Sequence, residues 1–197
     1  MTQRIIGLTG GIATGKTTVS DHLATSHHLP VLDADVYARE AVAGGSPILD
    51  TLSQRYGDNI LLDNGTLNRR QLGTIIFNDP TEKRWVEQQI HPFVRQRFTQ
   101  VSRDYPPTAT LVYAIPLLFE ANLTHLVSEI WVVSCRPEQQ QQRLMARNNL
   151  SLAEANARIN NQLPLTEKIA QADRVFDNSG DKSYLYQQID DALKSLH

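Results

Sequence analysis

The feature that most constrains this chain is a glycine-rich stretch near its start, where residues 10–17 read GGIATGKT. Gly10, Gly15, Lys16 and Thr17 match the pattern G-x-x-x-x-G-K-[ST], the phosphate-binding loop. Glycines let the backbone approach a phosphate closely, and successive N–H groups then form an anion-binding concavity. A lysine here reaches the β- and γ-phosphates, and the hydroxyl that follows can bind Mg²⁺. The stretch predicts a nucleoside triphosphate site.

The residues on either side of the loop supply the context that this pattern requires. An apolar run at residues 5–8 precedes the loop, and Val19 and Leu23 follow it at the i, i+4 spacing of one helical face. A helix that begins near Gly15 would point its unpaired N–H groups and the positive end of its dipole at the phosphates. The alternative is a chance glycine-rich turn, which the order of strand, loop and helix disfavours.

Length and composition restrict the class of protein further. The chain has 197 residues, 41% of them hydrophobic, and a formal net charge of −2, which suits one globular domain. The near-neutral charge argues against a broad basic surface for nucleic acid, and no apolar segment approaches the ~20 residues of a membrane span. Cys135 is the single cysteine, and we interpret it as a small, partly buried side chain. Without a signal-peptide pattern at its start, the chain is expected to be cytoplasmic.

Short apolar runs alternate with helix-forming segments along the chain. The expected strands are residues 5–8, 29–32, 110–115, 129–134 and 174–176. Such alternation predicts a parallel five-stranded sheet between two layers of helices, a three-layer α/β/α fold. Ligands bind such sheets beyond the carboxyl ends of the strands.

The remaining segments are expected to be helical. Residues 36–107 have little strand character and are too long for one crossover helix, so they predict a helical insert beside the sheet. Within it, helices are expected at 36–42, from Pro47, and over 67–98 with interruptions at 78–80 and at His91-Pro92. Further helices are expected from Pro137 to about 148, from a capping box at Ser151 to about 162, and over 183–196.

Two aspartates follow the second expected strand, at the edge of the sheet where ligands bind. In phosphoryl transfer to an alcohol, a carboxylate can accept the hydroxyl proton and align the oxygen with the γ-phosphorus. We favour Asp35 as this base, with Asp33 orienting it or assisting Mg²⁺. The alternative for one of the two is a helix N-cap.

Several basic side chains are candidates for anion contacts. Arg143 and Arg147 share one helical face, and Arg158 lies in the next helix, so this pair of helices could close over a triphosphate; a solvated face is the alternative. Arg69 and Arg70 could hold an anionic acceptor or simply be exposed. The six histidines show no metal-ligand spacing with cysteines or acids, and the pair at 27–28 is expected in a surface loop.

Taken in order, several segments resemble the dephospho-coenzyme A kinase family from Ile5 to about Gly180. These segments are GLTGGIATGKTT, LDAD, GTLNRRQL, HP, IPLLFE, RINNQ and ADRVFDNSG. The resemblance implies the P-loop NTPase fold in a single domain, 1–197, with an acceptor-binding insert at about 36–107 and a mobile helical lid at about 137–165. With its near-neutral charge and no long apolar segment, the chain is expected to be a monomer or weak homo-oligomer that binds no nucleic acid and no membrane.

The resemblance also implies an activity, which is transfer of the ATP γ-phosphoryl group to the ribose 3′-hydroxyl of dephospho-coenzyme A. This is the final step of coenzyme A biosynthesis. The implied catalytic residues are Asp35, Lys16, Arg147 and Asp33, with Mg²⁺ on Thr17. The implied ATP contacts are Gly11, Ala13, Thr14, Gly15, Lys16, Thr17, Thr18, Arg143 and, beside the adenine, Asn178. The implied acceptor contacts are Asp35, Arg69, His91, Leu117, Leu118 and Glu120.

The chain departs from the family pattern at two places. Ala13 stands where the family usually has glycine, so either its φ suits alanine or the loop is slightly strained. Residues 113–115 lack an aspartate that many members carry, which shifts the expected Mg²⁺ contacts to Thr17 and Asp33. Three alternatives remain open: a kinase with another acceptor, a nucleotide-dependent switch, and an inactive nucleotide-binding homologue. The switch is disfavoured because the chain has no Asn-Lys-x-Asp guanine-recognition motif.

Overall fold

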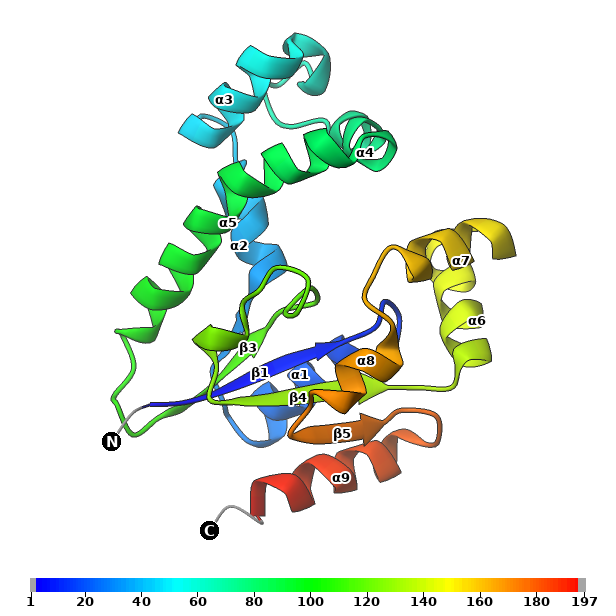
Figure 1. Ribbon diagram of the computed structural model, residues 1–197. Coiled ribbons are helices and arrows are strands. Elements are labelled where there is room, and N and C mark those ends of the chain that lie inside the picture. Colours follow the sequence, from blue (N-terminus) through cyan, green and yellow to red (C-terminus); the bar gives the residue numbers. More distant parts are fainter. Residues whose placement is uncertain (1–2, 195–197) are drawn as a thin grey trace. The chain divides into compact units, whose positions relative to one another are not determined.

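The fold is built on a five-stranded parallel sheet with strand order β2-β3-β1-β4-β5, seen in a computed structural model that describes residues 3–194 (Figure 1). The strands are β1 Arg4–Gly10, β2 Val31–Asp33, β3 Thr110–Ala114, β4 Glu129–Ser134 and β5 Arg174–Asp177. Every neighbouring pair is parallel, and β1 lies in the middle with Leu8 opposite both Ala114 and Trp131. Its residues from Ile6 to Gly10 are buried, as expected of a central parallel strand. The predicted α/β class is confirmed.

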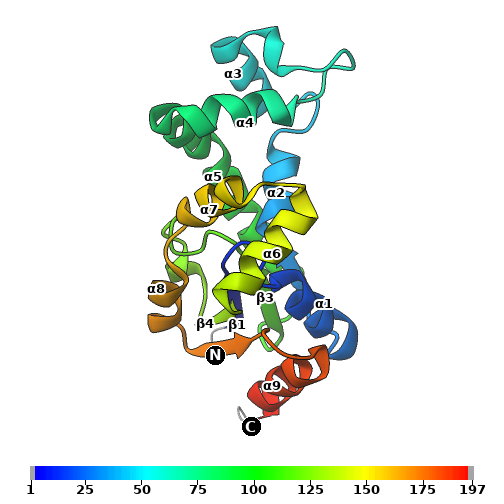
Figure 2. The ribbon, with the colours of Figure 1, turned by 90° about the vertical axis from the view of Figure 1, so that its right-hand side faces the viewer.

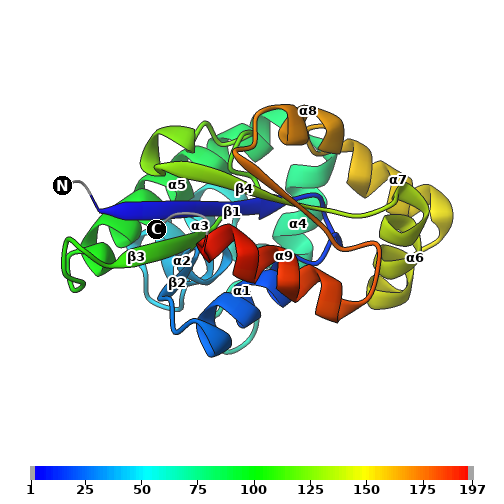
Figure 3. The same cartoon turned by 90° about the horizontal axis from the view of Figure 1, so that it is seen from below.

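The chain divides into two compact units, Met1–Asp33 with Pro106–His197, and Ala34–Tyr105. The first unit contains the sheet together with η2 Thr124–Leu126 and five longer helices. These are α1 Lys16–Ser26, α6 Pro137–Asn148, α7 Leu152–Asn160, α8 Leu165–Ala170 and α9 Lys182–Lys194. Figure 3 shows α1 and α9 on one side of the sheet and α8 on the other, which gives the three layers. The side chains of Val19, Leu23, Leu185 and Ile189 from α1 and α9 are fully buried in the main core, where they meet the sheet.

The second unit is entirely helical apart from one isolated bridge between Leu61 and Leu67. Its elements are α2 Ala34–Ala41, α3 Pro47–Tyr56, η1 Asp58–Ile60, α4 Arg69–Asn78 and α5 Pro80–Ser102. It has a hydrophobic core of its own, which includes Leu52 and Ile60. At its surface, Arg55 donates two hydrogen bonds of 2.7 Å to Glu82 and lowers the pKa of that carboxyl to about 2.

One predicted interruption is wrong, because α5 continues through His91 and Pro92. A proline inside a helix costs about 3 kcal/mol, since it removes a hydrogen bond and crowds the preceding turn. Beyond the proline, Val94 and Phe98 are 5% and 1% exposed. Burying two such side chains contributes roughly 1.5–3 kcal/mol each, which is enough to offset the proline. Tertiary packing therefore overrides the local signal.

Other element boundaries differ from the sequence predictions in small ways. The capping box at Ser151 is confirmed, since its hydroxyl accepts from the Glu154 N–H while Glu154 accepts from the Ser151 N–H. Helix α7 ends at Asn160, and the six-residue α8, which follows Pro164, was not predicted. The predicted end of the last helix at residue 196 lies outside the described residues. No helix between residues 3 and 194 is both long enough and apolar enough to cross a membrane.

Candidate functional site

The predicted phosphate-binding loop joins the end of β1 to the start of α1. Strand β1 ends at Gly10 and α1 begins at Lys16, so the loop lies at the carboxyl end of the central strand. Inside the loop, the Thr14 N–H and hydroxyl both donate to the Gly11 carbonyl, at 3.2 and 2.9 Å. The predicted order of strand, loop and helix is therefore present.

Two glycines of the loop lie where no other side chain fits. Gly15 has a φ of 107°, and a Cβ built on it would lie 2.0 Å from the side-chain nitrogen of Asn178. A Cβ on Gly10 would lie 2.6 Å from the Val133 carbonyl oxygen. The first position needs glycine for its conformation and its space, and the second for space alone.

The backbone at Ala13 decides between the two possibilities that the sequence left open, a φ that suits alanine or a slightly strained loop. Its φ is 61°, in the left-handed region that residues with a Cβ rarely adopt. Such a conformation costs roughly 1–2 kcal/mol for an L-residue. The loop is therefore strained at this position, and the surrounding contacts hold it there.

The start of α1 is suited to an anion. Among the described residues, no side chain caps this helix, and its first turn contains no acidic residue. The unpaired N–H groups and the positive end of the helix dipole remain for a ligand. The Lys16 ammonium lies 3.8 Å from Asp33 at the end of β2, and both side chains are partly exposed. A phosphate could therefore compete with this weak ion pair for the lysine.

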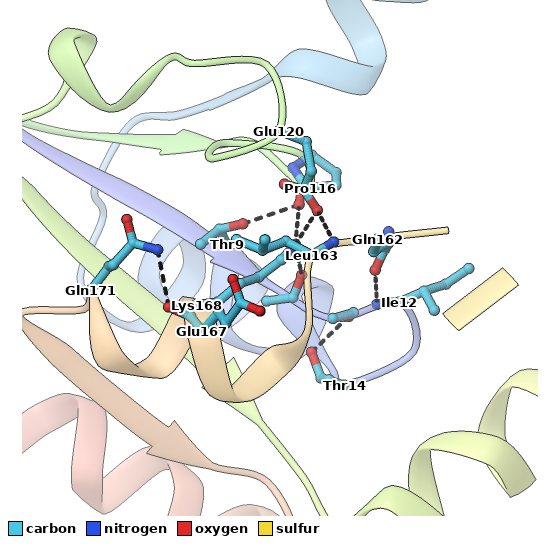
Figure 4. A network of polar contacts seen from close by, with 12 residues as sticks. Thr9, Ile12, Thr14, Pro116, Glu120, Gln162, Leu163, Glu167, Lys168 and Gln171 are labelled. Atoms are coloured by element: carbon cyan, nitrogen blue, oxygen red, sulfur yellow. Dashed lines mark hydrogen bonds and ion pairs between the residues drawn. The ribbon is translucent and has the colours of Figure 1, made fainter. Parts of the chain in front are cut away.

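Side chains distant in sequence hold the loop from outside. The Ile12 N–H donates to Gln162 at 2.8 Å, and the Gln140 amide donates to the Ile12 carbonyl at 2.8 Å. Figure 4 shows the first of these contacts, with Gln162 directed at the loop. Neither glutamine was predicted to be a site residue, because Gln140 is one of four consecutive glutamines in α6 and Gln162 lies in the segment between α7 and α8.

A buried lysine forms the centre of the network in Figure 4. Lys168 of α8 is 0% exposed, and its ammonium lies 2.8 Å from Glu120 and 3.4 Å from the carbonyl oxygens of Gly10 and Pro116. The same Glu120 oxygen accepts from the Leu163 N–H at 3.0 Å. A buried charge is tolerated only when it is paired and hydrogen-bonded. Through these contacts Lys168 connects α8 to the end of β1 and to the segment that contains Pro116 and Glu120.

Asn178 and Arg143, both predicted ATP contacts, lie against the loop. The Asn178 side-chain amide is buried and donates to the Thr14 carbonyl at 2.8 Å, while Arg143 donates to the Asn178 carbonyl at 2.9 Å. The buried Nη1 of Arg143 has no hydrogen-bond partner within residues 3–194. Both residues support the loop, and their contacts to ATP stay predictions.

Arg147 and Cys135 differ in exposure. Arg147 is exposed in the last turn of α6, where it donates to the Asn148 side chain at 2.9 Å.

Cys135 is buried directly after β4, and burial raises the pKa of its thiol. A thiol with a raised pKa is a poor nucleophile, which agrees with a structural cysteine.

The remaining predicted site residues fall into two groups. In the first unit, Leu118 is fully buried, Leu117 is half-buried, and Glu120 pairs with Lys168. The second unit contains Asp35 in the first turn of α2, the exposed Arg69 at the start of α4, and His91 within α5. Burial lowers the pKa of His91, which favours its neutral form. The acceptor contacts expected of all these residues stay predictions.

A central strand, a G-x-x-x-x-G-K-T loop and a helix within a parallel sheet define a nucleotide-binding protein of the P-loop class. A family model described as dephospho-CoA kinase matches residues 4–183. The dephospho-CoA kinase of Trichormus variabilis is 58% identical over 193 residues, which cover 98% of each chain. The chain therefore belongs to the dephospho-CoA kinase family.

Solved structures agree with this assignment. The dephospho-CoA kinase from Campylobacter jejuni is 26% identical, with a TM-score of 0.72 over 98% of this chain and 96% of that one. The structure of TT1252 from Thermus thermophilus is 32% identical, with a TM-score of 0.83 over the whole of both chains. The fold is thus shared over nearly the whole length, including both compact units.

The strain at Ala13 predicts that Ala13→Gly is tolerated and slightly stabilising. Relief of roughly 1–2 kcal/mol of strain should offset or exceed the roughly 0.4–1 kcal/mol of unfolded-chain entropy that glycine adds, leaving a gain of about 0–1.6 kcal/mol. Urea denaturation measures it. The matched control is Ala157→Gly at an exposed position inside α7, which should lose about 1 kcal/mol. Equal losses in both variants would contradict strain at Ala13.

The buried ion pair predicts that Lys168→Met is strongly destabilising, by about 3 kcal/mol or more. The change leaves Glu120 without its cation and two carbonyl groups without a donor. Urea denaturation again provides the measurement. Lys83→Met, which removes an exposed i, i+4 pair, is the control and should change the free energy of unfolding by less than about 0.5 kcal/mol. Similar small effects in the two variants would show that the buried pair contributes little.

Proposed function

We propose that this chain transfers the γ-phosphoryl group of ATP to the ribose 3′-hydroxyl of dephospho-CoA, giving coenzyme A and ADP. The loop geometry supports the donor, since it places uncapped helical N–H groups and Lys16 at the end of the central strand. The observation that carries the acceptor is the family match over residues 4–183, because a phosphate-binding loop by itself indicates only a nucleotide.

On the donor side, the loop residues from Gly11 to Thr18 surround the phosphates. Lys16 exchanges its contact with Asp33 for the β- and γ-phosphates, where its charge offsets the negative charge that develops during transfer. Arg143, the other proposed ATP contact on this side, lies against the loop, where it donates to the Asn178 carbonyl. Asn178 packs behind the loop at Thr14, from where it borders the adenine in the proposed complex.

The residues beside the loop fit Mg²⁺. Thr17 is exposed in the first turn of α1, and Asp33 ends the neighbouring β2, so hydroxyl and carboxylate oxygens are available. Mg²⁺ prefers such hard oxygen ligands together with phosphate oxygens and water. When bound, the ion would neutralise charge on the β- and γ-phosphates.

On the acceptor side, Asp35 is the proposed base. It accepts the proton of the 3′-hydroxyl as that oxygen bonds to the γ-phosphorus, and the bond from the γ-phosphorus to the bridging oxygen breaks to release ADP. Asp35 lies in the first turn of α2. The helical insert at about 36–107, with Arg69 and His91, would bind the acceptor, together with Leu117, Leu118 and Glu120.

Helices α6 and α7 form the proposed lid, at about 137–165. They pack together, with Gln141 donating to Asn156 at 2.8 Å, and Figure 2 shows them side by side. Arg147 is exposed on α6, from where it would reach the phosphates on closure. We place the enzyme in the cytoplasm, where ATP is available, as a monomer or weak homo-oligomer.

The role of Asp35 predicts that Asp35→Asn loses most turnover while ATP binding changes little. General base catalysis contributes about 10²–10⁴-fold, so kcat should fall about a hundredfold or more. Steady-state ADP release and calorimetric titration with ATP separate the two effects. Asp33→Asn serves as the comparison, and near-normal turnover of Asp35→Asn with a large loss in Asp33→Asn would move the base to Asp33.

The proposed reaction is tested by ADP release from Mg-ATP with dephospho-CoA, and with AMP or nucleosides as rival acceptors. Release only with dephospho-CoA, with coenzyme A identified by mass, is the expected result. Lys16→Ala should abolish transfer, because the phosphates lose their principal cation. ADP release with another acceptor would show that this acceptor, and not dephospho-CoA, is the substrate. ATP binding without any transfer would indicate a switch or an inactive homologue.

A further inference from the structure

A cluster of potential metal ligands lies where α1 ends, and phosphoryl transfer does not use it. His22 of α1, His27 directly after α1, and Asp190 of α9 each offer one ligand atom, and these atoms all lie within 4.8 Å of one another. The histidines show no metal-ligand spacing in the sequence, and spacing could not have indicated this cluster, because Asp190 is 163 residues from His27 and only the packing of α9 on α1 brings them together.

The two imidazoles converge on one carboxylate oxygen. The Nε2 atoms of His22 and His27 lie 2.8 and 2.7 Å from the same oxygen, Oδ1 of Asp190. Their rings meet edge to face, with centroids 5.3 Å apart and an angle of 81° between planes, so both nitrogens approach without stacking. In a tetrahedral zinc site, bonds of about 2.0–2.1 Å place neighbouring ligand atoms about 3.3 Å apart. The two histidine–carboxylate contacts would need to lengthen by about 0.5 Å, and the two imidazole nitrogens, which lie within 4.8 Å of each other, would need to settle at the same spacing.

One of the histidines is already fixed in the required orientation. The ring of His22 stacks on Tyr186, with centroids 4.0 Å apart and planes within 5°. Its other nitrogen, Nδ1, lies 3.2 Å from the Ser26 hydroxyl oxygen. When Nε2 binds a metal, Nδ1 carries the proton and donates to that oxygen. A partner of this kind holds the tautomer and the orientation of a histidine ligand.

The local charges also favour a cation. The last turn of α1 has no basic residue among the described positions, so the negative end of its dipole is not offset there. The three ligands carry one negative charge, from Asp190, when both imidazoles are neutral. A divalent ion at this point would therefore meet a carboxylate and the carbonyl end of a helix together.

We propose that His22, His27 and Asp190 form a binding site for a divalent transition metal, with Zn²⁺ as the ion and water as the fourth ligand. Two imidazole nitrogens and one carboxylate oxygen suit Zn²⁺ and Co²⁺, whereas Mg²⁺ prefers oxygen ligands alone. The site is thus chemically distinct from that of Mg-ATP. A metal bound here links α1, which begins at the phosphate-binding loop, to α9, and it stabilises the folded chain by RT ln(1 + c/Kd), which grows with the free metal concentration c.

Tag-free, metal-stripped protein titrated with Co²⁺ tests the site, because cobalt in such a site gives visible d–d absorption bands. The bands should appear and persist in excess Mg²⁺, and Zn²⁺ should displace them and raise the thermal midpoint. His27→Asn and Asp190→Asn should weaken Co²⁺ binding by more than the roughly 10–100-fold that loss of an outer-shell partner costs. The control is His28→Asn, since His28 is outside the cluster and its φ of 53° suits asparagine.

Each other outcome counts against the site. Absence of the bands in the native protein, or bands that survive both His27→Asn and Asp190→Asn, would overturn the proposal. So would loss of the bands in His28→Asn, or their displacement by Mg²⁺, which would place the cobalt at the phosphate-binding loop. If Asp190→Asn does not fold, His22→Gln with His27→Asn decides the matter, because both retain the carboxylate on α9.

Discussion

The phosphate-binding loop depends on hydrogen bonds that it receives from outside itself. Its backbone can point N–H groups toward an anion only while its carbonyl groups are satisfied elsewhere. The carbonyls of Gly10, Ile12 and Thr14 accept from Lys168, Gln140 and Asn178, which lie 158, 128 and 164 residues away. These contacts hold a loop that includes one strained residue, Ala13, and two glycines packed against their neighbours. The geometry for phosphate binding is therefore a property of the whole first unit.

Charge is distributed around the loop in two environments. Lys16 and Asp33 are partly exposed and 3.8 Å apart, so their pairing is weak and a ligand can replace it. Lys168 and Glu120 are 2.8 Å apart with the ammonium fully buried, so solvent and salt screen their attraction much less. Lys16 can therefore exchange its partner for a nucleotide phosphate, whereas Lys168 fixes the end of β1, where the loop begins. The same residue type thus serves in binding and in architecture, according to its burial.

Much of the fold could be predicted from the sequence, because buried parallel strands appear as apolar runs and the capping box at Ser151 is a local signal. The interruption expected at Pro92 was wrong, because the burial of Val94 and Phe98 is a tertiary effect. Of the candidate site, the loop residues followed from their spacing. Lys168 and the cluster of His22, His27 and Asp190 could not be predicted, since a buried lysine resembles a surface one in sequence and the third member of the cluster is contributed by the last helix.

The side chains that hydrogen-bond to the loop come much later in the sequence than the loop itself, which matters while the chain is being synthesised. The loop leaves the ribosome well before Gln140, Gln162, Lys168 and Asn178, which lie 128 to 164 residues after the loop residues that they contact. A nascent chain that has exposed the complete glycine-rich motif still lacks the donors that bind its carbonyl groups. Affinity for the nucleotide should therefore arise late in translation, and a chain that terminates before residue 178 would carry the motif without a formed site.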